Sequence, residues 1–175
     1  SPALWVIRNG GSAFFSHSSA LVFCSSYSFF HSSPSNDSFS NRWRFLSYLV
    51  KCIVHERPYT VYGYKGKQVR DNLHAFDVCS AIHSFMKNPK SAAVYNLGGT
   101  RASHVSILEA IAKIEALTGK KGKITYIDEV RLGDHKWYIT DMSKFKNDYP
   151  EWRVTRNIDT ILEEMCRYEM ERAND

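Results

Sequence analysis

Two adjacent charged residues, Arg70 and Asp71, follow a short apolar stretch and a turn with two glycines in the sequence VYGYKGKQVRDNLHAFDV, Val61 to Val78. A guanidinium stays charged and presents a planar fork of donors that matches phosphate oxygens. The pair therefore indicates either a grip on an anionic group or a structural ion pair, which at a surface contributes at most about 1 kcal/mol. Residue types alone leave both interpretations open.

The composition limits the classes of function. The chain has 175 residues and a net charge of +5, with a pI of about 9.0, which favours anionic ligands. No block of consecutive Lys and Arg and no aromatic–basic stripe is present, so we expect no nucleic-acid partner. The four cysteines are far apart and form no Cys-x-x-Cys pair. We therefore expect no metal site, no membrane partner and reduced thiols in a cytoplasmic protein.

The first forty residues differ from the rest, because they carry only Arg8 and Asp37 as charges and are rich in serine and phenylalanine. They show neither a helical period nor a clean strand alternation. The apolar run Ala20 to Cys24 is too short to span a membrane, and the segment matches a signal peptide poorly. We predict a low-complexity leader over residues 1–41, disordered or mis-joined, and a folded part over residues 42–175.

From Asn41 onward, helical and strand patterns alternate, which predicts an α/β fold. A capping box of Ser106 and Glu109, with Gly119 at the far end, marks the clearest helix. Asp77 is predicted to cap the N-terminus of another helix. The expected helices lie within RFLSYLVKCIVHERP, DVCSAIHSFMKNP, SILEAIAKIEALTGKKG, TDMSKFKNDYPEW and NIDTILEEMCRYEMERA, and the expected strands are YTVYGY, AAVYNLGG and KITYID.

Three motifs, taken in order, carry a resemblance to a known family: VYGYKGKQVRDNLHAFDV, VYNLGG and RLGDHKWYITDMSKFKNDYPEW. From about Arg44 to Arg172 the chain resembles the C-terminal half of an extended short-chain dehydrogenase/reductase. This is the family of NAD-dependent nucleotide-sugar epimerases and dehydratases. The resemblance implies a partial Rossmann-like fold, isomerase chemistry with NAD, and a nucleotide-diphosphate sugar as ligand, with a CDP-sugar favoured.

The resemblance also implies roles for five residues. Arg70 and Arg131 would contact the diphosphate, Asp134 the ribose hydroxyls, and Tyr62 the base, while Asn96 would lie near the same pocket. The chemistry is consistent, because a diphosphate carries about two charges that two arginines neutralise. A carboxylate likewise accepts hydrogen bonds from two vicinal hydroxyls. Taken alone, Arg131 and Asp134 are a plain charged loop, and Tyr62 is a strand residue of the core.

The catalytic half of such an enzyme is missing from the pattern. No Gly-x-x-Gly-x-x-Gly turn occurs, and no tyrosine is followed four residues later by a lysine that would lower its pKa for base catalysis. We therefore expect a truncated epimerase with no catalytic residues, which keeps the nucleotide-sugar pocket but binds no NAD. The complete enzyme would be a candidate homodimer. The strand AAVYNLGG would have no large sheet to join.

Two alternatives stay open at this stage. One is a non-catalytic module that binds a nucleotide sugar or another protein. The other is an α/β interaction domain without a ligand. A formed nucleotide pocket would separate the first from the second, because only such a pocket should prefer one base over another.

Overall fold

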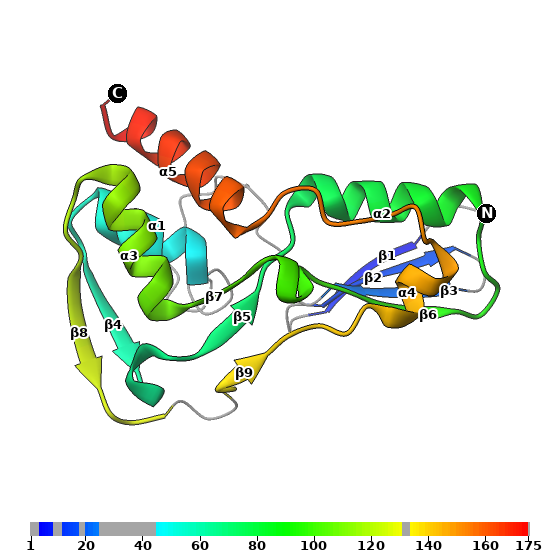
Figure 1. Cartoon of the computed structure of the whole chain (residues 1–175), viewed down its shortest axis with the longest axis horizontal. Coiled ribbons are helices and arrows are strands. Elements are labelled where there is room, and N and C mark those ends of the chain that lie inside the picture. The colour runs from blue at the N-terminus through cyan, green and yellow to red at the C-terminus, as the bar shows by residue number, and fades with distance from the viewer. Residues whose placement is uncertain (1–3, 9–11, 18–19, 25–44, 131–133, 175) are drawn as a thin grey trace. The chain divides into compact units, whose positions relative to one another are not determined.

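The computed structural model describes residues 4–8, 12–17, 20–24, 45–130 and 134–174 (Figure 1). These residues fall into two compact units, each built from three ranges of the sequence. Unit 1 draws on Ser1–Ser33, Asp71–His104 and Ile139–Asn157, and unit 2 on Pro34–Arg70, Val105–Tyr138 and Ile158–Asp175. The boundary predicted near residue 41 falls outside the described residues.

Unit 1 contains a four-stranded sheet in the order β1-β2-β3-β6. Its strands are β1 (Leu4–Arg8), β2 (Ser12–His17), β3 (Ala20–Cys24) and β6 (Val94–Leu97). Neighbours β1, β2 and β3 pair antiparallel, whereas β3 and β6 pair parallel, with Val22 opposite Tyr95.

This sheet corrects two predictions. Residues 4–8, 12–17 and 20–24 of the serine-rich segment form strands. The strand AAVYNLGG does have a sheet to join. A polar–apolar alternation is typical of a half-buried strand, but a strand with a parallel neighbour is often a short continuous apolar run. The run Ala20–Cys24 is of that kind, and it is β3.

The core of unit 1 is aromatic and lies between β6 and two helices, α2 (Ala75–Lys87) and α4 (Ser143–Asp148). Alternation along β6 buries Tyr95 and Leu97 and exposes Val94 and Asn96. The rings of Tyr95 and Phe145 meet edge to face at 5.3 Å. Burial raises the pKa of Tyr95, whose hydroxyl donates to Asp148 Oδ2 over 2.5 Å.

The N-terminus of α2 corrects a third prediction. His74, not Asp77, is the N-cap, because its Nδ1 accepts a hydrogen bond from the backbone N–H of Phe76 at 3.0 Å. Asp77 lies in the first turn and is fully buried. Its carboxylate accepts hydrogen bonds from Thr155 N, Thr155 Oγ1 and Arg156 N at 3.1, 2.6 and 3.0 Å. A buried carboxylate in unit 1 thus holds a loop that is distant in sequence.

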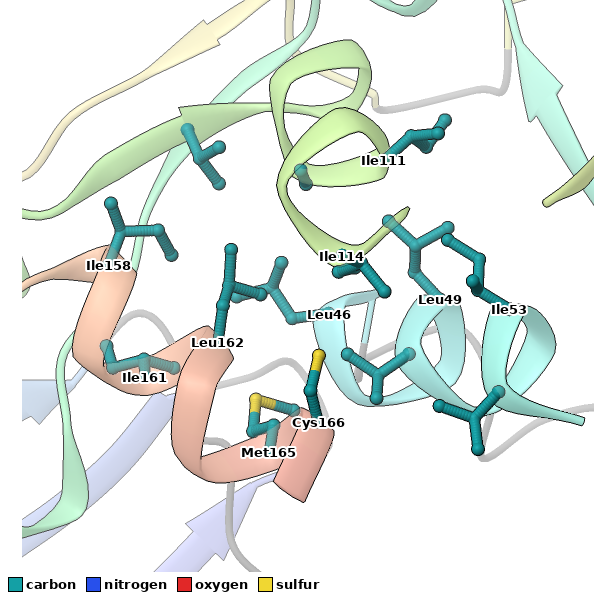
Figure 2. Close-up of a cluster of buried hydrophobic side chains, with 14 of the residues drawn as sticks. Leu46, Leu49, Ile53, Ile111, Ile114, Ile158, Ile161, Leu162, Met165 and Cys166 are labelled. Carbon is teal, nitrogen blue, oxygen red and sulfur yellow. The ribbon is translucent and has the colours of Figure 1, made fainter. Parts of the chain in front are cut away.

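Unit 2 packs three helices, α1 (Phe45–Val54), α3 (Ile107–Thr118) and α5 (Ile158–Asn174), around one apolar cluster (Figure 2). The predicted capping box at α3 is confirmed, since Ser106 Oγ accepts from Glu109 N, and the Glu109 carboxylate accepts from Ser106 N. Gly119 closes the helix in the left-handed conformation. Buried Cys166 points into this cluster, and burial raises the pKa of its thiol to about 11.

Short parallel strands complete the architecture. In unit 2, β4 (Pro58–Tyr62) pairs parallel with β8 (Lys123–Ile127). A second sheet has the order β7-β5-β9, formed by β7 (His104–Ser106), β5 (Val69–Asp71) and β9 (Trp137–Tyr138). Short 3₁₀ turns lie at Tyr64–Gly66 and Thr100–Ala102. The α/β class predicted from the sequence is confirmed.

Candidate functional site

The turn between β4 and β5 has an unusual backbone. Gly63, Tyr64, Lys65 and Gly66 all have a positive φ, between 46° and 72°. Only glycine adopts this region without a steric penalty, so Tyr64 and Lys65 are strained. Gly63 N donates to Ile127 O at 2.8 Å, which fixes the turn against the end of β8. This fixed turn sets where β5 begins.

Replacing Lys65 with glycine is expected to raise the free energy of unfolding by about 0.5–1 kcal/mol, because it removes the left-handed strain at φ 53°. Lys67 is the matched control, since its φ of −89° is ordinary, and Lys67→Gly should lower stability by about 0.5 kcal/mol. Urea unfolding measures both variants. Equal losses for the two would show that the turn stores no strain.

Arg70 lies on β5 and is held at both ends of its guanidinium. Its Nη1 donates to Val69 O at 2.8 Å, and its Nη2 forms an ion pair with Asp134 Oδ1 at 2.5 Å. The side chains of Arg70 and Asp134 are 24% and 25% exposed, respectively. The predicted diphosphate and ribose residues, 64 positions apart in sequence, therefore lie together, and each is partly open to solvent.

Gln68 is a site residue that the sequence argument missed. Its Nε2 donates to Tyr62 O at 2.6 Å and approaches Asp134 Oδ2 at 3.4 Å. Tyr64 closes the same loop, since its hydroxyl donates to Asp134 O at 3.4 Å. Alternation along an extended segment places residues two apart on one face, and this spacing joins Gln68 to Arg70. The spacing was visible in the motif and could have drawn attention to Gln68.

Asp71 has a structural role, unlike the adjacent Arg70. It is fully buried in unit 1, and its Oδ2 accepts hydrogen bonds from Thr100 N at 3.0 Å and Thr140 N at 3.1 Å. A Cβ on Gly98 would clash with Asp71 Oδ2 and Thr140 Oγ1. Gly98 is thus needed for close packing within the chain. Asp71 positions two loops, whereas Arg70 faces the site.

The remaining predicted residues are placed as follows. Tyr62 ends β4 and is half-buried, on the strand face opposite the core residue Val61. Asn96 belongs to unit 1, where its side chain is exposed on β6. Arg131 lies outside the described residues. Within unit 2, Tyr62, Gln68, Arg70 and Asp134 are therefore the connected set.

Residues 15–98 match the family model described as "NAD dependent epimerase/dehydratase family". The match extends over the turn, Gln68, Arg70 and β6. This range is just under half of the chain, and over it the chain is similar to the NAD dependent epimerase/dehydratase family. The matched range begins at residue 15, so it includes part of the segment that was expected to be an unrelated leader.

Individual members of this family are similar over part of their length. CDP-paratose 2-epimerase of Salmonella typhi is 32% identical over 93 residues, which are 52% of this chain and 27% of that protein. The structure of dTDP-glucose 4,6-dehydratase from Bacillus anthracis in complex with NAD matches with 28% identity and a TM-score of 0.61, over 74% of this chain and 40% of that one.

A third relative has a sugar nucleotide in its structure. UDP-glucuronic acid 4-epimerase from Bacillus cereus, in complex with UDP-glucuronic acid and NAD, is 25% identical, with a TM-score of 0.62 over 71% of this chain and 38% of that one. The chain thus spans less than half the length of each of these three family members. Their names refer to three different nucleotides.

The described residues do not fit a dinucleotide cofactor. Such a cofactor needs a glycine-rich turn that brings its pyrophosphate to a helix N-terminus. Helices α2, α3, α4 and α5 instead follow His74, Ser106, Met142 and Asn157. The space beside Gly98 is filled by Asp71 and Thr140. We therefore assign these residues no step of hydride transfer.

No helix in the described part of the chain is both long and apolar enough to cross a bilayer. No group of three or more His, Cys, Asp or Glu side chains there could hold a metal ion.

Proposed function

We propose that unit 2 binds the nucleoside diphosphate part of a nucleotide sugar. Arg70 would contact the diphosphate, Asp134 the ribose hydroxyls, and Tyr62 the base. The observation that carries this proposal is the Arg70–Asp134 ion pair, which brings a phosphate-type donor and a hydroxyl-type acceptor together at a partly exposed position. Arg131, three residues before Asp134 in the sequence, would supply the second positive charge for the diphosphate.

The pairing of Arg70 with Asp134 suits such a ligand. In the absence of a ligand the carboxylate neutralises the guanidinium, so neither charge is left uncompensated in a partly buried place. A nucleoside diphosphate would bring phosphate oxygens to the guanidinium and hydroxyl donors to the carboxylate. Both groups would then exchange part of their mutual hydrogen bonding for bonds to the ligand.

The wider activity that we propose is sugar-nucleotide epimerisation of the CDP-paratose 2-epimerase kind, with this chain supplying the nucleotide site. That relative's identity of 32% supports the proposal. The alternative is a binding module without catalysis. It is favoured by the poor fit of the described residues to a dinucleotide.

Isothermal titration of the whole chain with CDP, UDP, dTDP and inorganic pyrophosphate tests the binding proposal. We expect at least one nucleoside diphosphate to bind about tenfold or more tightly than pyrophosphate, because base and ribose add contacts to those of the phosphates. The ranking of CDP and UDP would identify the preferred base, because both carry ribose, whereas dTDP lacks the 2′-hydroxyl. Equal affinity for all four compounds, or no binding, would contradict the proposal.

A further inference from the structure

Gln68 is a polar residue at a buried position. It is only 2% exposed, and its Nε2 makes the two contacts with Tyr62 O and Asp134 Oδ2. Its Oε1 is buried without a hydrogen-bond partner among the described residues. A buried unsatisfied acceptor costs folding free energy, which an apolar side chain of the same length would avoid. The amide is therefore not explained by stability alone.

The amide of Gln68 helps to fix the orientation of the Asp134 carboxylate. Asp134 has one carboxylate oxygen directed to Arg70 and the other to Gln68. Two separate contacts restrict rotation of the carboxylate more than one contact does. The same amide donates to Tyr62 O, so one side chain links the proposed ribose and base residues.

We infer that Gln68 is a positioning residue, which aims the Asp134 carboxylate at the ribose hydroxyls of the ligand. The inference rests on the proposed nucleotide-binding function. Without the amide, Asp134 would keep its bond to Arg70 and lose the second contact that fixes its plane. A carboxylate free to rotate accepts two vicinal hydroxyl bonds less well, because the geometry must be fixed on binding.

The test compares CDP with 2′-deoxy-CDP in the full chain, by isothermal titration. The ratio of the two affinities reports the ribose contact and cancels most of the diphosphate contribution. We expect the unmodified chain to prefer CDP about tenfold, and Gln68→Met to reduce this preference to about twofold. Urea unfolding should show that Gln68→Met is close to the unmodified chain in stability, since its buried acceptor is removed.

A double-mutant cycle separates positioning from an independent structural effect. Asp134→Asn should also lose the ribose preference, and adding Gln68→Met to it should cause no further loss, because the two residues act as one unit. Lys67→Met is the matched control: its side chain is exposed and adjacent, so the ribose preference should persist. The asparagine of Gln68→Asn is too short to reach Asp134, so this variant should behave like Gln68→Met. It replaces Gln68→Met in the test if that variant fails to fold.

The outcomes distinguish this inference from the proposed function. A full ribose preference in Gln68→Met, or additive losses in the double variant, overturns the positioning role while nucleotide binding stands. An unmodified chain that binds CDP and 2′-deoxy-CDP equally also overturns the inference and leaves diphosphate binding in place. An unmodified chain that binds neither overturns both.

Discussion

Replacing Arg70 with alanine is expected to weaken the binding of the preferred nucleoside diphosphate by about 1.5–3 kcal/mol, which is roughly ten- to 150-fold. The guanidinium is the phosphate-type donor of the connected set in unit 2, and Val69 O and Asp134 Oδ1 hold it in place. Its removal also leaves the Asp134 carboxylate without its positive partner, so the ligand would meet an uncompensated negative charge. Isothermal titration measures the change.

Two controls accompany this variant. Arg70→Lys keeps the charge but loses the planar fork, so its affinity should lie between those of the unmodified chain and Arg70→Ala. Arg101→Ala removes an exposed arginine from unit 1 and should leave affinity unchanged. A folded Arg70→Ala chain with unchanged affinity would refute the role of Arg70 in binding.

Replacing Asp77 with alanine is expected to lower the free energy of unfolding by about 3 kcal/mol. The Asp77 carboxylate accepts three hydrogen bonds from Thr155 and Arg156 and is fully buried in unit 1. Alanine would leave the two backbone donors without their acceptor and open a small cavity. Urea unfolding, followed by circular dichroism, measures the loss.

A graded series makes the Asp77 experiment specific. Asp77→Asn keeps one acceptor oxygen but turns an amide N–H group toward backbone donors, so its loss should be intermediate. His83→Ala changes an exposed position on the same helix and should alter stability by less than about 0.5 kcal/mol. If Asp77→Ala cost no more than His83→Ala, the carboxylate would not hold the Thr155 loop.

Asp77 also shows why a local rule failed. An aspartate before an apolar helical pattern is a good candidate for an N-cap. Here the carboxylate bonds to Thr155, which lies 78 positions away, and His74 caps the helix instead. A sequence window around α2 contains no information about that distant loop. The capping box of α3 was predictable because both of its partners, Ser106 and Glu109, lie within one turn.

The residues of the candidate site also fall into two groups, those that the sequence predicted and one that only the structure revealed. The resemblance of the motifs to a family selected Arg70, Asp134 and Tyr62, and the structure places these three in the connected set of unit 2. Gln68 was missed because a glutamine carries no charge, although it lies two residues before Arg70 in the motif. Its importance comes from two bonds, one of them to a residue 66 positions later.

The sequence by itself determined the α/β class, the main helices, the α3 caps and the resemblance to a family. Periodicity, capping and motif residues are local, and each can be recognised within a short window. Only the tertiary structure decided that β3 pairs with β6, that Asp77 holds Thr155, and that Arg70, Gln68 and Asp134 meet. These are contacts between distant segments. Their partners are selected by the packing of the whole fold, and no local pattern specifies them.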